Sequence, residues 1–177
     1  MIMAKMLMVD HSKCTGCRLC EVVCSVKKNG AANPSRARIA VIKWESICVE
    51  TPMICQQCES APCVAICPVG ALSRDEGLGR VVVDYDLCIG CRFCVAACPF
   101  GAMGIDSVAR RVIKCDLCDG DPTCVKFCET GALQYVDASA ASQAKRRGSP
   151  EPLRFAQEDG TESRPGLTPR QRVRGDS

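Results

Sequence analysis

Sixteen of the seventeen cysteines in this 177-residue chain fall into four compact groups. The groups are Cys14-x2-Cys17-x2-Cys20-x3-Cys24, Cys55-x2-Cys58-x4-Cys63-x3-Cys67, Cys88-x2-Cys91-x2-Cys94-x3-Cys98 and Cys115-x2-Cys118-x5-Cys124-x3-Cys128. Each group must close around something that sulfur binds, so the spacing constrains the fold more tightly than any apolar pattern does. Only Cys48 stands outside the groups.

The cysteines are expected to bind metal and not to form disulfides. Disulfide scaffolds belong to oxidising compartments, and the stretch from Met1 to Asp10 lacks the unbroken apolar run and the small-residue cleavage site of a secretory signal. No later segment has the length of a membrane-spanning helix. The sequence therefore predicts a cytoplasmic protein. Its aromatic residues are few, one Trp, two Tyr and four Phe, so metal centres are expected to fill space that side chains do not.

The four groups alternate between two patterns. Groups one and three share Val-Asp-x3-Cys-x-Gly-Cys-Arg, starting at Val9 and Val83. Groups two and four place Pro62 and Pro122 just before the third cysteine. Shared flanks outside the cysteines indicate duplication of a two-group unit.

Closely spaced cysteine runs of this kind are typical of [4Fe–4S] clusters. In the bacterial C-x2-C-x2-C-x3-C-P run, three cysteines hold one cluster and the fourth crosses to the other cluster of a pair. Group three has that run in full, ending at Pro99. Zinc ribbons use separated C-x2-C pairs, which fit four groups of four less well. The sequence predicts four [4Fe–4S] clusters.

Two pairings of the groups fit the spacing. Sequential pairing joins group one with two and three with four, whereas nested pairing joins two with three and one with four. Proline follows groups two and three (Pro68, Pro99) but is replaced by Ser25 and Glu129 after the others, which favours nesting. The nested sets are Cys14, Cys17, Cys20 with Cys128; Cys115, Cys118, Cys124 with Cys24; Cys55, Cys58, Cys63 with Cys98; and Cys88, Cys91, Cys94 with Cys67.

The expected fold class is α+β: two bacterial-ferredoxin-like modules of short strands and short helices, the inner nested within the outer, followed by an irregular tail. The outer pair of clusters is assigned to residues 6–50 and 108–137, and the inner pair to 51–107. Strands are expected at Met6–Val9, Ile39–Lys43, Arg80–Val83 and Arg111–Ile113, short helices after the third cysteines, as at Val95–Ala97, and a loop at Lys27–Ser35.

Five further residues carry weaker predictions. Cys48 is expected to be a buried thiol and Trp44 a core residue. His11, the single histidine, is expected at the surface near group one. Arg18 and Arg92 lie between ligands, where they either offset cluster charge or are ordinary solvated side chains.

The tail from residue 138 differs in composition from the rest. Residues 1–137 hold 15 basic and 15 acidic side chains, and the tail holds 8 and 5, so the formal charge of +3 lies in the tail. A neutral core gives no reason to expect nucleic-acid binding. The tail has too little apolar periodicity to fold alone. Disorder is favoured, and the alternative is an arm that binds a partner through Leu153, Phe155 and Leu167.

Over about residues 1–137, the four motifs resemble the four-cluster ferredoxin subunits of molybdenum and tungsten pterin oxidoreductases, which include subunits of formate dehydrogenase, dimethyl sulfoxide reductase and hydrogenase-linked complexes. The short chain is most similar to the small subunit that accompanies tungsten aldehyde oxidoreductases. The resemblance implies nested pairing, a pterin-containing catalytic partner, and a flavin subunit, a ferredoxin or another copy of the chain as the second partner.

No nucleophile–base pair, G-x-G-x-x-G or P-loop is visible in the sequence. The chain is therefore expected to carry electrons and not to be an enzyme itself. Two alternatives stay open: a free-standing polyferredoxin, and a structural or maturation iron–sulfur protein.

Overall fold

The computed structural model describes residues 5–139. Its strands pair into four separate antiparallel sheets, each of two strands. The strands are β1 (Lys5–Val9), β2 (Ala40–Trp44), β3 (Val49–Met53), β4 (Leu72–Asp75), β5 (Arg80–Val83), β6 (Met103–Asp106), β7 (Arg111–Lys114) and β8 (Leu133–Asp137). The helices are α1 (Leu19–Asn29), α2 (Pro62–Ala65), α3 (Phe93–Ala97) and α4 (Thr123–Lys126). Short 3-10 turns cover His11–Lys13, Pro34–Arg36, Glu45–Ile47 and Leu117–Gly120.

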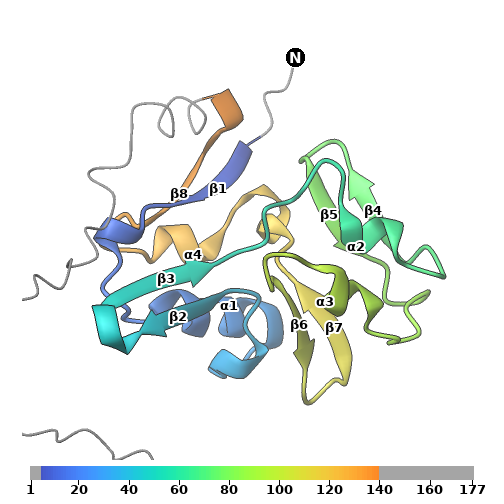
Figure 1. Cartoon of the computed structure of the whole chain (residues 1–177), viewed down its shortest axis with the longest axis horizontal. Helices are drawn as coiled ribbons and strands as arrows, with labels where there is room; N and C mark the ends of the chain where they lie inside the picture. Colours follow the sequence, from blue (N-terminus) through green and yellow to red (C-terminus); the bar gives the residue numbers. More distant parts are fainter. Residues whose placement is uncertain (1–4, 140–177) are drawn as a thin grey trace, which may run out of the picture.

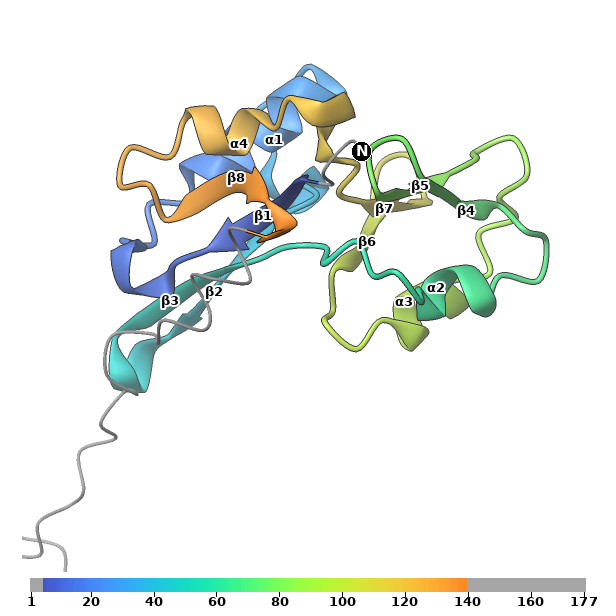
Figure 2. The ribbon, with the colours of Figure 1, turned by 90° about the horizontal axis from the view of Figure 1, so that it is seen from above.

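The elements form two lobes, which are clearest from above (Figure 2). One lobe, here called the outer module, holds α1, α4 and the sheets β1–β8 and β2–β3. The other, the inner module, holds α2, α3 and the sheets β4–β5 and β6–β7 (Figure 1). β1 pairs with β8, with Leu7 opposite Tyr135. The two ends of the described chain therefore meet in the outer module, and a segment that lies between them in the sequence forms the inner module.

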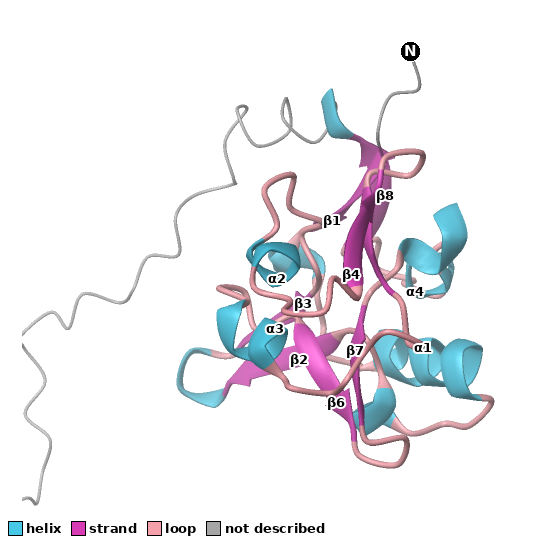
Figure 3. Ribbon diagram, turned by 90° about the vertical axis from the view of Figure 1, so that its right-hand side faces the viewer, coloured by secondary structure: helices cyan, strands magenta, loops and turns pink. Residues whose placement is uncertain are grey.

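Each lobe has its own apolar core. The outer core includes Leu7, Ile39, Val41, Ile54, Leu117 and Leu133, together with Cys20, Cys24 and Cys124. The inner core is Leu72, Val81, Met103, Val112 and Cys94. Helices lie beside helices in both, α1 against α4 and α2 against α3 (Figure 3). Cysteines are thus part of both cores.

The expected strands are confirmed within one residue at each end, and the short helix at Val95–Ala97 is confirmed as part of α3. The predicted loop at Lys27–Ser35 is wrong at its start, because α1 continues to Asn29. The helix α1 ends where Gly30 adopts a left-handed φ of 71° and donates its N–H to the Val26 carbonyl at 2.8 Å. The segment 108–114, expected in the outer part, belongs to the inner module, because β7 pairs with β6 and Val112 lies in the inner core.

Two predictions on the β2–β3 hairpin are wrong. Trp44 is 44% exposed, and Cys48 is an exposed thiol. Both lie at the tip of the hairpin, which extends beyond the core that Val41 and Ile54 complete. The tail from residue 140, with Leu153, Phe155 and Leu167, lies outside the described residues. Within the described part, no helix combines the length and the apolar character needed to cross a membrane.

Candidate iron–sulfur centres

All four cysteine loops bend at the same place, the residue just before the second cysteine. There Gly16, Gln57, Gly90 and Leu117 have φ values of 64°, 50°, 69° and 59°. This left-handed conformation suits glycine but is uncommon for other residues. Gln57 and Leu117 are held in it by burial, since they are 8% and 1% exposed.

The two alternating sequence patterns are two ways to start a helix at the third cysteine. In groups one and three, Arg18 and Arg92 adopt left-handed φ values of 60° and 66° and precede α1 and α3. In groups two and four, Pro62 is the first residue of α2 and Pro122 precedes α4; the proline ring presets the backbone angle of a first turn. Each third cysteine therefore lies in the first turn of a helix.

The fourth cysteines of groups two, three and four are followed by one shared turn. Gly70, Gly101 and Gly131 have φ values of 65°, 60° and 66°, and each donates its N–H to the carbonyl of the cysteine three residues earlier. After this turn, backbone N–H groups point at sulfur: Ala71 donates to Cys67 Sγ at 3.3 Å and Leu133 to Cys128 Sγ at 3.4 Å. In groups two and four, the turn after the fourth cysteine thus positions a backbone donor toward the sulfur of that cysteine.

Group one ends differently, because Cys24 lies within α1. Its Sγ accepts a hydrogen bond of 3.3 Å from the backbone N–H of Arg38, which lies on the segment leading into β2. The continuation of the helix to Asn29 replaces the turn that the other three groups use.

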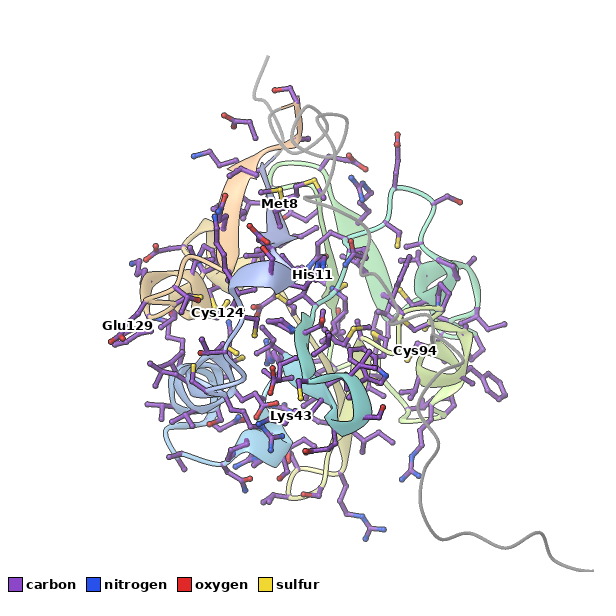
Figure 4. All side chains as sticks on the ribbon, turned by 60° about the vertical axis from the view of Figure 1, so that its left-hand side comes forward. Met8, His11, Lys43, Cys94, Cys124 and Glu129 are labelled. Atoms are coloured by element: carbon purple, nitrogen blue, oxygen red, sulfur yellow. The ribbon has the colours of Figure 1, made fainter. Side chains whose placement is uncertain are left out.

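The structure gathers cysteines from distant parts of the chain around shared hollows. One hollow is lined by Cys24, Cys115, Cys118 and Cys124, a second by Cys14, Cys17, Cys20 and Cys128, and a third by Cys55, Cys58, Cys63 and Cys98. The remaining four cysteines are Cys67, Cys88, Cys91 and Cys94 of groups two and three. Cys94 is part of the inner core, and Cys67 and Cys88 pack against that core, as Cys63 and Cys98 also do. Figure 4 shows sulfur atoms around Cys124 in the outer module and around Cys94 in the inner module.

The donor set fits iron–sulfur clusters. Each hollow offers four thiols and a mostly apolar lining, with Val41, Pro52 and Leu133 beside the second and Val81 and Met103 beside the third. Within residues 5–139, no three His, Cys, Asp or Glu side chains converge on a single point as ligands of one metal ion would.

Burial dominates the acidity of the thiols. Desolvation raises the pKa of Cys20 and of Cys115 to about 12 each, and it raises the pKa of Cys24, Cys63, Cys94 and Cys124 as well. For Cys67, burial also acts to raise the pKa, but the N–H groups of residues 69–72 outweigh it and lower the pKa. Buried thiols that must become thiolates release protons when they bind iron.

The weaker sequence predictions divide. His11 is exposed, as expected, on the 3-10 turn after β1 (Figure 4). The Nε of Arg18 donates to the buried carboxylate of Glu21 at 2.8 Å, so its charge is paired within the protein. Arg92 is an exposed side chain, which agrees with the solvated alternative. Cys48 lines none of the three hollows.

Two polar residues near the centres are missed by the sequence analysis. Gln57 donates from Nε2 to the Cys115 carbonyl at 2.8 Å and accepts the Val81 N–H at 2.9 Å. Lys114 is 3% exposed and donates to Gln57 Oε1 at 3.2 Å. The available signal was a lysine that ends an apolar strand directly before Cys115, where group two has Ile54 before Cys55.

Comparison with known proteins gives two family matches. A profile described as a 4Fe-4S dicluster domain matches residues 47–138, and a profile described as a 4Fe-4S binding domain matches residues 11–27. Together they cover all four cysteine groups.

Individual relatives are similar over the same region. The chain is 43% identical over 122 residues to YsaA of Escherichia coli K12, covering 64% of this chain and 75% of that protein. It is 44% identical over 119 residues to the electron transport protein HydN of the same organism, covering 63% and 65%. It is 45% identical over 93 residues to the polyferredoxin-like subunit of aliphatic sulfonate oxidoreductase from Pyrococcus furiosus, covering 52% and 53%. About a third of HydN and half of the P. furiosus subunit lie outside the match.

Proposed function

We propose that this chain, which belongs to the 4Fe-4S dicluster domain family and is similar to an electron transport protein and to a subunit of an oxidoreductase, is an electron-transfer subunit with four [4Fe–4S] centres. The chain carries several such clusters. A bound [4Fe–4S] cluster accepts and releases single electrons. The protein's part is to hold each cluster, to orient donors toward its sulfur and to fix the surrounding charge.

The observation that carries the proposal is the grouping of thiols around the hollows. It supports three centres with nested ligands: centre I, Cys14, Cys17, Cys20 and Cys128; centre II, Cys24, Cys115, Cys118 and Cys124; and centre III, Cys55, Cys58, Cys63 and Cys98. The four cysteines that remain in groups two and three are assigned to centre IV: Cys67, Cys88, Cys91 and Cys94. Sequential pairing would require Cys24 to leave the hollow it shares with group four.

Contacts between thiols support the order I, II, III, IV along the molecule. Cys20 and Cys124 pack in the same outer core, which brings centre I next to centre II. Cys55 is close enough to Cys115 for its charge to act with burial in raising the pKa of the Cys115 thiol, which brings centre II next to centre III. Cys63 and Cys94 pack at the inner core, which brings centre III next to centre IV. The line therefore runs through both modules.

We further propose that one end of this line meets a catalytic oxidoreductase subunit and the other a second redox protein. The resemblance of the motifs points to a pterin-containing subunit with tungsten or molybdenum, and to a flavin subunit, a ferredoxin or a second copy of the chain as the other partner. The P. furiosus relative is named as a subunit of an oxidoreductase, which supports a catalytic partner of some kind.

Metal analysis of paired ligand variants tests the proposal. Anaerobically purified protein is expected to contain about sixteen irons per chain, four for each cluster. Changing Cys14 and Cys128 together to alanine removes two ligands of one centre under nested pairing and leaves about twelve irons. Under sequential pairing the same variant damages two clusters and leaves about eight.

Cys48→Ala is the matched control, since it removes a thiol outside the hollows and is expected to leave the iron content unchanged. Wild-type protein with zinc in place of iron, or with far fewer than sixteen irons, would refute the proposed function. Clusters that do not cycle reversibly in a redox titration would point instead to a structural role.

A further inference from the structure

Lys114 is a buried cation whose partners are all neutral. Its Nζ donates to the carbonyl of Val81, to the carbonyl of Cys115 at 2.8 Å and to Oε1 of Gln57 at 3.2 Å. The residue is 3% exposed. All three hydrogens of the ammonium are thereby used, and its charge is held in one place.

No carboxylate lies within ion-pair distance of this ammonium among residues 5–139. Other cations near the cysteines are paired: Lys28 and Arg38 both contact Asp116, at 2.8 Å and 2.6 Å. Burying an unpaired charge is costly. The fold therefore keeps the positive charge of Lys114 buried without an acidic side chain to balance it among the described residues, so we look for the balancing negative charge in a bound group.

The ammonium lies at the boundary of centres II and III. Cys115, whose carbonyl it contacts, is a ligand of centre II. Gln57 belongs to the loop between Cys55 and Cys58 of centre III, and Val81 lines the hollow of that centre. Two of its three contacts thus come from the side of centre III and one from centre II.

The internal repeat shows that this charge is not required to build such a loop. Ile54 and Leu117 occupy the positions in groups two and four that correspond to Lys114 and Gln57, and both line the hollow of centre II. Ile54 and Leu117 thus line a hollow of the same kind with apolar side chains alone. The polar pair occurs once, between the two middle centres.

We propose that the ammonium of Lys114 raises the reduction potentials of centres II and III, the two middle members of the line. This inference rests on the proposed function. Each reduction adds a negative charge to a cluster, and net charge is one of the determinants of its potential. A fixed positive charge stabilises the reduced form more strongly in a buried site than it would in water.

The test is a redox titration of the full-length, iron-loaded protein followed by electron paramagnetic resonance. Lys114→Met is expected to lower two of the four potentials, by at least a tenfold change in electron affinity, which for one electron is 59 mV. The other two potentials stay. Lys114→Arg, which keeps the charge, is expected to stay near wild type.

The matched control is Lys43→Met, which removes the same charge from a side chain that is 41% exposed on β2 and is expected to leave all four potentials unchanged. If Lys114→Met does not hold iron, Gln57→Glu decides, because it places a carboxylate against the ammonium and is expected to lower the same two potentials.

Unchanged potentials in an iron-loaded Lys114→Met or Gln57→Glu protein overturn the inference. If neither variant holds iron, Lys114 is a structural element and the inference is also overturned. Wild-type protein lacking four clusters would refute the proposed function itself, so the two failures are distinguishable.

Discussion

The outer and inner modules build the same cysteine loops on different amounts of protein. The outer core contains nine buried residues and is completed by the eleven-residue helix α1 and by the β2–β3 hairpin. The inner core contains five, and its helices α2 and α3 have four and five residues. The comparison teaches that loop geometry is set locally, whereas stability is distributed unequally between the modules.

The loops of groups one and three make the contrast at single positions. Group one has Lys13 and Thr15 beside its first cysteine, and a buried Glu21 that accepts the Val41 N–H at 2.6 Å and so ties α1 to β2. Group three has Leu87 and Ile89 at the positions of Lys13 and Thr15, and both are more than half exposed. Group three has Val95 at the position of Glu21. Valine has no carboxylate, so it cannot accept the hydrogen bond by which Glu21 links α1 to β2.

The largest expected effect comes from removing the clusters. A chelator added under anaerobic conditions is expected to unfold the inner module before the outer one, because five buried residues supply little apolar free energy without the metal. Hydrogen exchange followed by mass spectrometry reports this: amides of residues 55–114, which form the inner module, should lose protection first. Protein without chelator, sampled at the same times, is the control. Earlier exchange in α1 and β1 would contradict the ranking of the modules.

A smaller effect is expected at the seam between the modules. Arg36 of the outer module donates three hydrogen bonds of 2.7–3.0 Å to the carboxylate of Asp106 in the inner module. Asp106 is 0% exposed. Asp106→Asn is expected to lower the free energy of unfolding by roughly 3 kcal/mol, since it removes one charge of a buried pair. Thermal unfolding measures the change.

The contribution of this pair should depend on pH. The side-chain hydrogen bonds from Arg36 lower the pKa of Asp106 to about 2 from an ordinary value of 3.8. Stability from the pair is therefore present above pH 3.8 and is lost as the pH falls toward 2. The difference between wild type and Asp106→Asn should narrow over that window. Glu76→Gln, at an exposed pair with Arg74, is the matched control and should change little at any pH.

The smallest expected effect separates two equivalent glycines. Gly16 and Gly90 both have left-handed φ values, 64° and 69°. A Cβ at Gly16 would lie 2.6 Å from Cγ of Glu50, whereas one at Gly90 would meet nothing within 4 Å. Gly90→Ala is expected to cost about 1 kcal/mol from backbone strain alone, and Gly16→Ala more.

Denaturant unfolding of both variants checks this difference. Adding Glu50→Ala to Gly16→Ala should bring its cost down to that of Gly90→Ala. If the two single variants lose the same free energy of unfolding, the Glu50 side chain on β3 moves aside without cost, and the expected difference is contradicted.

Much of the site could be predicted from the sequence because its signals are local. The ligand spacing, the Gly-Ala step after the fourth cysteines and the proline before the third each act within a few residues. Four of the eight strands were found from apolar runs, but their partners β3, β4, β6 and β8 were not. The partner strands lack such runs and are fixed by pairing, either across a turn or, for β1 and β8, between the two ends of the described chain. Trp44 and Cys48 were misplaced because an apolar residue at a hairpin tip has the same sequence signature as one in a core.

The sequence by itself determined that this chain binds several iron–sulfur clusters, since sixteen sulfurs at such spacings leave few other chemistries. Only the tertiary structure decided which thiols share a hollow, which residues belong to each core, and that Lys114 is buried among neutral partners. The physical reason is distance along the chain: a loop closes over a handful of residues, but Cys24 meets Cys115, and Lys114 meets Gln57, only when segments far apart in the sequence have packed together.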